Sequence, residues 1–110
     1  METEMKYDVE MNKGGVVYLA GPMTGIEGYN RELFSEVAQW LENEFWCRVI
    51  NPGLLPLGLD ENAYMPICME MIRAADAIVL LPGWEQSKGA ALEKHFAEYL
   101  GKRVYQITEE

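Results

Sequence analysis

The sequence predicts an α/β fold: an open parallel sheet of about four or five strands with helices on both faces. Short apolar runs rich in β-branched residues alternate with longer segments of helical periodicity. The runs are continuously apolar, which is typical of strands buried on both faces of a parallel sheet. The order strand–helix–strand–helix–strand–helix–strand requires crossover connections. Right-handed crossovers place the carboxyl ends of all the strands at one edge of the sheet.

Four apolar runs are predicted as strands, each bounded by turn residues. They span residues 16–20, 48–50, 77–81 and 104–107. Glycine and proline follow each of the first three runs within three residues, and both interrupt regular structure. The strands are therefore short and end at loops rather than continuing into helices.

Three segments carry helical spacing of apolar residues. The first begins near Asn30, and the third spans residues 87–100 and ends at Gly101, a typical C-terminal stop. For the second, Asp60 or Asn62 is the expected N-cap, so that Pro66 falls in the first turn, where proline is tolerated. The expected inner face of this second helix consists of Ile67, Met71 and Ala74.

Length and composition indicate one folded domain. The chain has 110 residues, of which 49% are hydrophobic, including three Trp and six Tyr, so it forms a core of its own. We expect the domain to span residues 14–110. Residues 1–13 have mixed charge and no clear periodicity, so this N-terminal segment is expected to be partly ordered.

The charge balance excludes several partners. The net charge of −9, from 18 acidic and 9 basic residues, argues against a nucleic-acid polymer and against an anionic membrane surface. It leaves open a small phosphate ligand, which backbone N–H groups bind without positive side chains. There is no signal-peptide pattern and no apolar run near ~18 residues, so a soluble cytoplasmic protein is expected.

The sequence predicts no metal and no cofactor. Cys47 and Cys68 fit neither a metal-ligand spacing nor a disulfide framework, and they are expected to be free, buried thiols. The Walker A and dinucleotide-binding glycine patterns are absent. His95, the single histidine, has no Ser, Asp or Glu at a spacing that builds a catalytic triad.

Two glycine-containing loops point to a ligand site at the carboxyl edge of the sheet. One follows the first strand and the other follows the third, so both leave the same edge, where open α/β sheets bind ligands. We therefore expect a shared cleft. The candidate binding residues in these loops are Gly21, Pro22, Met23, Gly25, Gly83 and Trp84.

The start of the third long helix adds candidates for chemistry. Ser87 is a good N-cap, and the free N–H groups near Gly89 are suited to a phosphate, although a cap and a packing glycine explain the same pair. Glu93 shares one helix face with Ala90 and Ala97. This face places Glu93 either against the sheet edge below the cleft or, as for most glutamates, in solvent.

These motifs resemble the nucleoside 2-deoxyribosyltransferase superfamily. The first strand and loop, residues 17–25 (VYLAGPMTG), resemble one signature. Residues 75–84 (ADAIVLLPGW), followed by S-x-G-A-x-x-E-x-x-x-A-x-x-L-G-K-x-V over 87–104, resemble the second. The closest likeness is to the DUF4406 branch of small proteins often found in bacteriophages and prophages, and it covers residues 16–104.

The resemblance implies a three-layer Rossmann-like (flavodoxin-like) fold and a homodimer or higher homo-oligomer. It implies a nucleoside or nucleoside 5′-monophosphate as the small-molecule partner. Glu93 falls at the family's nucleophilic Glu, and Tyr18 falls at the Tyr that lies near the sugar and orients that Glu. Ser87 and Gly89 fall where the nucleotide-hydrolysing branch binds the 5′-phosphate.

Two functions from different classes follow from the resemblance. The first is an enzyme that hydrolyses or transfers the base at the N-glycosidic bond through Glu93. The second is a catalytically weak or inactive nucleotide-binding protein of phage origin, which would sequester or sense a nucleotide. Cys68 motivates the second, because it stands where the family often has an Asp. A purely structural interaction protein is a third reading, suggested by the acidic composition and the aromatic first helix.

Overall fold

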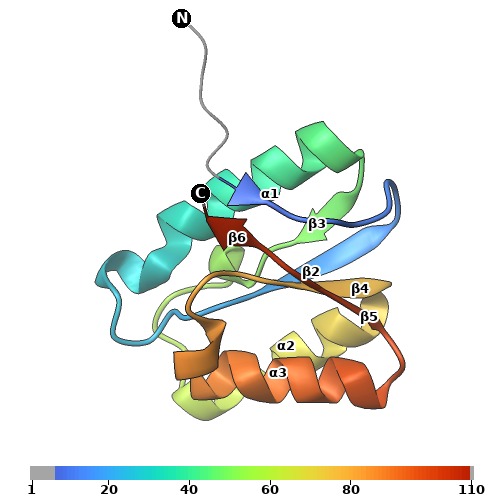
Figure 1. Ribbon diagram of the computed structural model, residues 1–110. Coiled ribbons are helices and arrows are strands. Elements are labelled where there is room, and N and C mark those ends of the chain that lie inside the picture. The colour runs from blue at the N-terminus through green and yellow to red at the C-terminus, as the bar shows by residue number, and fades with distance from the viewer. Residues whose placement is uncertain (1–6, 110) are drawn as a thin grey trace, which may run out of the picture.

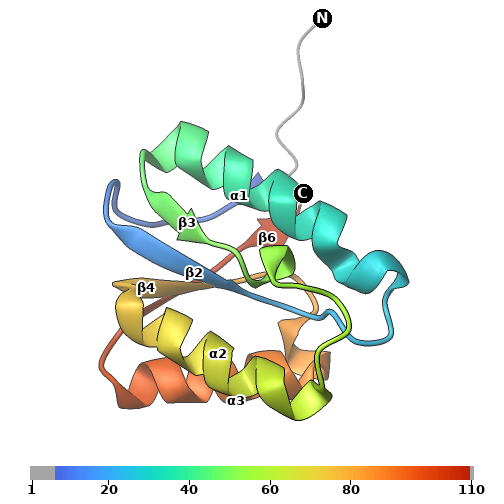
Figure 2. The ribbon, with the colours of Figure 1, turned by 180° about the vertical axis from the view of Figure 1, so that it is seen from behind.

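The computed structural model describes residues 7–109 and shows a four-stranded parallel sheet between two helical layers (Figures 1 and 2). The strand order is β3-β2-β4-β5. All neighbours in this sheet are parallel, with Tyr18 opposite Ile50 on one side and Ile78 on the other. The strands are β2 (Val16–Ala20), β3 (Arg48–Ile50), β4 (Ala77–Leu80) and β5 (Arg103–Gln106).

The helices cover both faces of the sheet, which confirms the predicted fold class. α1 (Arg31–Phe45) lies on one face, and α2 (Glu61–Ala74) and α3 (Lys88–Tyr99) lie on the other (Figure 1). Three short 3₁₀ helices, Glu27–Asn30, Pro52–Leu54 and Trp84–Gln86, follow the carboxyl ends of β2, β3 and β4. Among the described helices, none is long and apolar enough to cross a membrane.

Two apolar layers form because side chains alternate along each strand. In β2, Val17 and Leu19 pack in the layer beneath α1, whereas Tyr18 and Ala20 belong to the layer beneath α2 and α3. The central position of β2 buries both of its faces. Tyr18 therefore brings a phenol hydroxyl into an otherwise apolar layer, where it needs a polar partner.

The second helix differs from the prediction in phase. Its N-cap is Asp60, and it starts at Glu61, so Pro66 is the sixth residue and not part of the first turn. The missing N–H of Pro66 removes one intrahelical bond, and the exposure of this proline lets water replace it. The inner face is also shifted: Cys68 and Ile72 are buried, whereas the expected Ile67 and Ala74 are exposed.

The two ends of the described chain meet in a small antiparallel pair. β1 (Tyr7–Asp8) pairs with β6 (Thr108–Glu109). Tyr7 and Val9 are buried against the α1 layer, and the Tyr7 hydroxyl donates to Glu36 Oε2 at 2.7 Å. Residues 1–6 of the expected partly ordered segment lie outside the described residues.

The strand order creates a crevice between β2 and β4. The chain leaves β2 through α1 on one face of the sheet, and it leaves β4 through α3 on the opposite face (Figure 2). Loops that part in this way open a crevice at the carboxyl ends of the two strands. The topology therefore places a crevice here before any side chain is considered.

Gly21 is required by close packing at this crevice. A Cβ at this buried position lies 2.8 Å from the Leu81 Cβ, whereas a Cβ at Gly89 meets only the flexible Met65 Cε at 3.7 Å. Gly21→Ala is therefore expected to lower the free energy of unfolding by about 1–3 kcal/mol. Gly89→Ala, in a helix, is expected to leave it unchanged or slightly raised. Urea unfolding of both variants checks this, and equal stabilities would contradict it.

Candidate active site

A buried carboxyl group lies at the centre of the candidate site. Tyr18 is fully buried in β2, and its hydroxyl donates to Glu93 Oε2 on α3 at 3.0 Å. Glu93 is itself only 8% exposed. Its neighbours on the buried stripe of α3, Ala90 and Ala97, are small and let the helix approach the sheet. The sequence pattern therefore brings a polar pair together inside an apolar layer.

Burial controls the protonation of this pair. Desolvation raises the pKa of Glu93 to about 7, although contacts with Tyr18 and Cys68 act in the opposite direction. Burial, reinforced by the nearby Glu93, raises the pKa of Tyr18 well above its ordinary value. Burial also raises the pKa of the Cys68 thiol to about 11. Near neutral pH, Glu93 is therefore poised between its two forms, and the other two groups remain neutral.

A cleft of about 820 Å³ opens above this pair at the carboxyl edge of the sheet. This volume suits a nucleotide-sized ligand. Tyr18, Cys68 and Glu93 line it. The sequence-predicted binding residues that also line it are Gly21, Pro22, Met23, Ser87 and Gly89.

The start of α3 presents free backbone donors to the cleft. The Ser87 Oγ accepts from the Ala90 N–H at 3.1 Å, and the Ser87 carbonyl accepts from the Ala91 N–H at 2.9 Å. The N–H groups of Lys88 and Gly89 have no acceptor within the helix, because they precede its first hydrogen bonds. Both residues line the cleft. This arrangement is suited to an anion.

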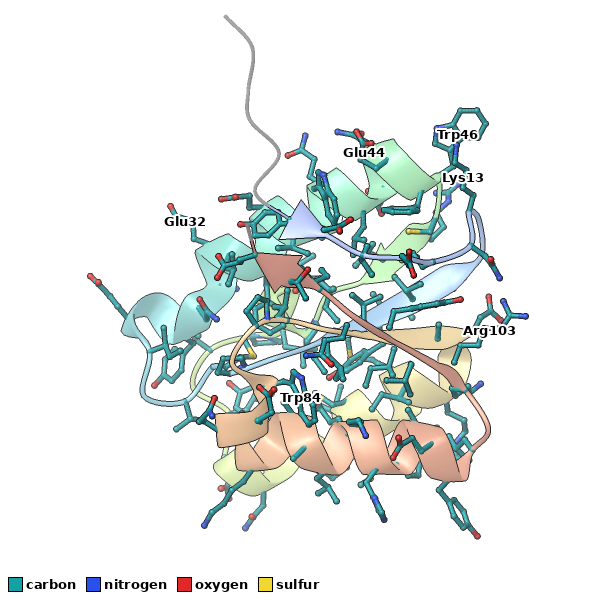
Figure 3. All side chains as sticks on the ribbon, viewed as in Figure 1. Lys13, Glu32, Glu44, Trp46, Trp84 and Arg103 are labelled. Carbon is teal, nitrogen blue, oxygen red and sulfur yellow. The ribbon has the colours of Figure 1, made fainter. Side chains whose placement is uncertain are left out.

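Three predicted binding residues lie elsewhere. Gly25, Gly83 and Trp84 are not among the described residues that line the cleft. Trp84 packs against the α3 layer, with Lys94 Nζ 5.4 Å from its ring centroid, and Figure 3 shows it beside α3. Gly25 and Gly83 have φ values of +85° and +89°, a conformation that favours glycine, so they shape the two loops.

The opposite wall of the cleft includes residues that sequence reasoning did not select. Arg31, the first residue of α1, donates through Nε to the carbonyl of Gly53, just after β3. The apolar loop of residues 55–59 also lines the cleft and is held by Tyr64, whose hydroxyl donates to the Pro56 carbonyl at 2.6 Å. The Asn51-Pro52-Gly53 turn follows a predicted strand, so the sequence could have indicated that this turn lies at the cleft. Nothing in the sequence singled out Arg31.

The charge inside the cleft differs from that of the whole chain. Of the described residues that line it, Arg31 and Lys88 are cationic and Glu93 is the sole acid. Glu70, the acid nearest in sequence to Cys68, is exposed and pairs with Arg73 at 3.4 Å. The described residues contain no cluster of three His, Cys, Asp or Glu side chains that would hold a metal. The lining therefore suits an anionic organic ligand.

Comparison with known proteins places the chain in a family. Its fold is similar to that of a 2-desoxiribosyltransferase from Leishmania mexicana, with a TM-score of 0.65 and 24% sequence identity. The match covers 81% of this chain and 61% of that one. Residues 15–106 match the domain of unknown function DUF4406, so the chain belongs to the DUF4406 family. No curated protein matches it with significance.

These matches bear out the resemblance seen in the sequence. The family match confirms the DUF4406 branch, and the structural likeness confirms the deoxyribosyltransferase-like, Rossmann-like fold. At this level of identity the likeness establishes the fold alone. The roles of the cleft residues rest on their own geometry.

Glu93 makes stability depend on pH. Its pKa is about 7 in the folded chain and ordinarily 4.5, so between these values the native state binds more protons than the unfolded state. Stability from this group is present below pH 4.5 and is lost as pH rises through 7, on the order of 3 kcal/mol in all. Glu93→Gln should therefore gain stability relative to wild type across this window.

Urea unfolding at pH 4.5 and pH 8 measures the effect. Glu98→Gln, an exposed substitution on the same helix, serves as the control and should follow wild type. Tyr18→Phe removes a contact that lowers the pKa of Glu93, so it should move the transition to higher pH. An unchanged pH dependence in Glu93→Gln would show that Glu93 does not carry the effect.

Proposed function

We propose that the protein cleaves or transfers the N-glycosidic bond of a nucleoside or nucleoside 5′-monophosphate. One observation supports this most directly: a buried carboxyl group, hydrogen-bonded to Tyr18, faces a cleft that also receives the open start of α3. A carboxylate in such a position is suited to attack an anomeric carbon. The 2-desoxiribosyltransferase fold supports a nucleoside-related ligand.

The proposed reaction has two steps. A Glu93 oxygen forms a bond to C1′ while the C1′–N bond breaks, and the base leaves with the bonding electrons and takes up a proton from solvent. Water then attacks C1′, releases the sugar and regenerates the carboxylate, with its proton passing to solvent. A second base in place of water gives transfer instead of hydrolysis.

Tyr18 is proposed to position the nucleophile. Its hydroxyl donates to one carboxyl oxygen, Oε2, and the other oxygen is the one proposed to attack the sugar. The same hydrogen bond favours the ionised form, against the desolvation that raises the pKa of Glu93. Activity in this proposal requires ionised Glu93 and therefore rises with pH through about 7.

The start of α3 is proposed to bind the 5′-phosphate. The N–H groups of Lys88 and Gly89, together with the Lys88 ammonium, supply the donors, and Ser87 holds the turn. Glu93 lies six positions after Ser87, which corresponds to about 9 Å along the helix axis. The Glu93 side chain leans back toward the helix start. A ribose and its phosphate fill this interval.

Cys68 supports a second candidate function. A neutral thiol, not a carboxyl group, stands beside Glu93, and the nearby Glu70 faces solvent. The described lining residues therefore offer no second carboxyl group to protonate the departing base. A nucleotide-binding protein with little or no turnover fits this arrangement, and in a phage or prophage it would sequester or sense the nucleotide.

A homodimer or higher homo-oligomer remains part of the proposal. Ile26, Leu54, Leu57 and Leu59 are large apolar side chains, each at least 38% exposed, in the loops at the carboxyl edge of the sheet. A second copy packed there would cover them. Sedimentation equilibrium should give a mass of at least two chains, and a monomer at high concentration would contradict this expectation.

The enzyme proposal predicts that Glu93→Gln loses base release by about a thousandfold or more, because the bond-forming oxygen is removed. The assay measures free base from a panel of ribo- and deoxyribonucleosides and their 5′-monophosphates. Glu98→Gln, on the same helix but exposed, should retain wild-type rates.

The same panel separates the two candidates. Base release by wild type that Glu93→Gln abolishes supports the enzyme. Equal release by both, or none by either, excludes it. Calorimetry that then shows tight nucleotide binding without release identifies the binding protein, and the absence of binding excludes both.

A further inference from the structure

We propose that Arg31 reads the base of the ligand and makes the cleft selective for 6-oxopurines, namely guanine and hypoxanthine. The inference rests on the proposed function, because it assumes a nucleotide in the cleft. It adds a recognition residue and a substrate class. The arguments are the placement of Arg31, its free donors, and the hydrogen-bonding pattern that those donors require.

Arg31 is held in place by an unusual piece of backbone. The three residues before it, Gly28, Tyr29 and Asn30, have φ values of +62°, +53° and +61°. Such values are uncommon for Tyr and Asn and persist where contacts hold them. Here the Asn30 Nδ2 donates to the Pro22 carbonyl at 2.9 Å, which ties the segment to the loop after β2. The first residue of α1 is thereby fixed at the cleft wall.

One donor of the Arg31 guanidinium group, Nε, is engaged within the protein. Its Nε donates to the Gly53 carbonyl, which anchors the group near the end of β3. Within the described residues its two terminal nitrogens make no hydrogen bond, so they remain for a ligand. Among the side chains that the structure describes, none forms an ion pair with Arg31. Glu93 is engaged by Tyr18 and Cys68.

A guanidinium group only donates hydrogen bonds, so its ligand must present acceptors. Two adjacent acceptors match its paired terminal nitrogens best. Guanine and hypoxanthine offer O6 and N7 in this arrangement. Adenine places an amino donor at position 6 and cytosine places one at position 4, and each would face another donor. Such a mismatch is strongly disfavoured in a partly buried site.

The layout of the cleft places the base near Arg31. The anion-binding start of α3 follows β4, Glu93 contacts the central strand β2, and Arg31 with Gly53 lies at the end of β3. A nucleotide with its phosphate at α3 and its sugar at Glu93 therefore extends its base toward β3. The apolar loop held by Tyr64, and the lining residue Tyr29, offer faces for a flat ring there.

The experiment measures binding by calorimetry and not turnover, with Glu93→Gln as the background if wild type is active. The main comparison is dIMP with dAMP, which differ in the group at position 6. With Arg31 present, dIMP and dGMP should bind about tenfold more tightly than dAMP or dCMP. The nucleosides deoxyinosine and deoxyadenosine should show the same preference at lower affinity.

Two substitutions of Arg31 test the residue itself. Arg31→Met should remove the preference for dIMP over dAMP. Arg31→Gln should reverse it, since a glutamine amide pairs with adenine N6 and N7. Lys88→Met is the matched control: it should weaken all nucleotides equally and leave nucleosides unaffected. Thermal melting of each variant verifies folding.

The outcomes separate this inference from the proposal beneath it. If no nucleotide or nucleoside binds, the proposed function fails. If nucleotides bind but dIMP and dAMP bind equally with Arg31 present, only the inference about the base is overturned. If Arg31→Met weakens every nucleotide equally and no nucleoside, Arg31 holds phosphate and the inference is likewise overturned.

Discussion

The hydrogen bond between Tyr18 and Glu93 is the interaction on which the site depends. It joins the central strand to α3 through a layer that is otherwise apolar. Burying a carboxyl group there costs several kcal/mol unless it is neutralised or hydrogen-bonded. The fold meets this requirement with a phenol that is equally in need of a partner. The same burial that makes an ionised Glu93 unfavourable also raises its pKa to about 7, so that near neutral pH both the protonated and the ionised form are present.

The sheet topology turns this pair into a site. Because β2 and β4 are neighbours whose chains depart to opposite faces, a crevice opens at their carboxyl ends, directly above Tyr18. The small buried residues of α3, Ala90 and Ala97, have two effects. They let the helix approach the sheet closely enough for Glu93 to reach Tyr18, and they bring the helix start, with its free N–H groups, to the cleft. The buried carboxyl group of Glu93 and the open helix start therefore belong to one helix.

Positive charge is confined to a few groups of the cleft. A chain with a net charge of −9 repels anions at long range, so the cleft can attract one only locally. Among the described residues that line the cleft, Arg31 and Lys88 are cationic, and the start of α3 adds its free N–H groups. Cys68 is the exception in this arrangement. Its neutral thiol lowers the pKa of the neighbouring Glu93 but adds no second acid to the cleft.

The sequence by itself determined the fold class, the four parallel strands and the cap at Ser87. Each rests on local periodicity or on a motif within one element. That Tyr18 lies near Glu93 was an expectation from the family resemblance, because the two residues belong to different elements. The strand order, the β1–β6 pair and the phase of α2 needed the tertiary structure. A strand's neighbours in the sheet are distant in sequence. The position of Pro66 does not reveal which face of α2 is buried. The same holds for Arg31, which reaches the cleft only because a left-handed turn after β2 meets the end of β3. No local pattern records where two such loops meet.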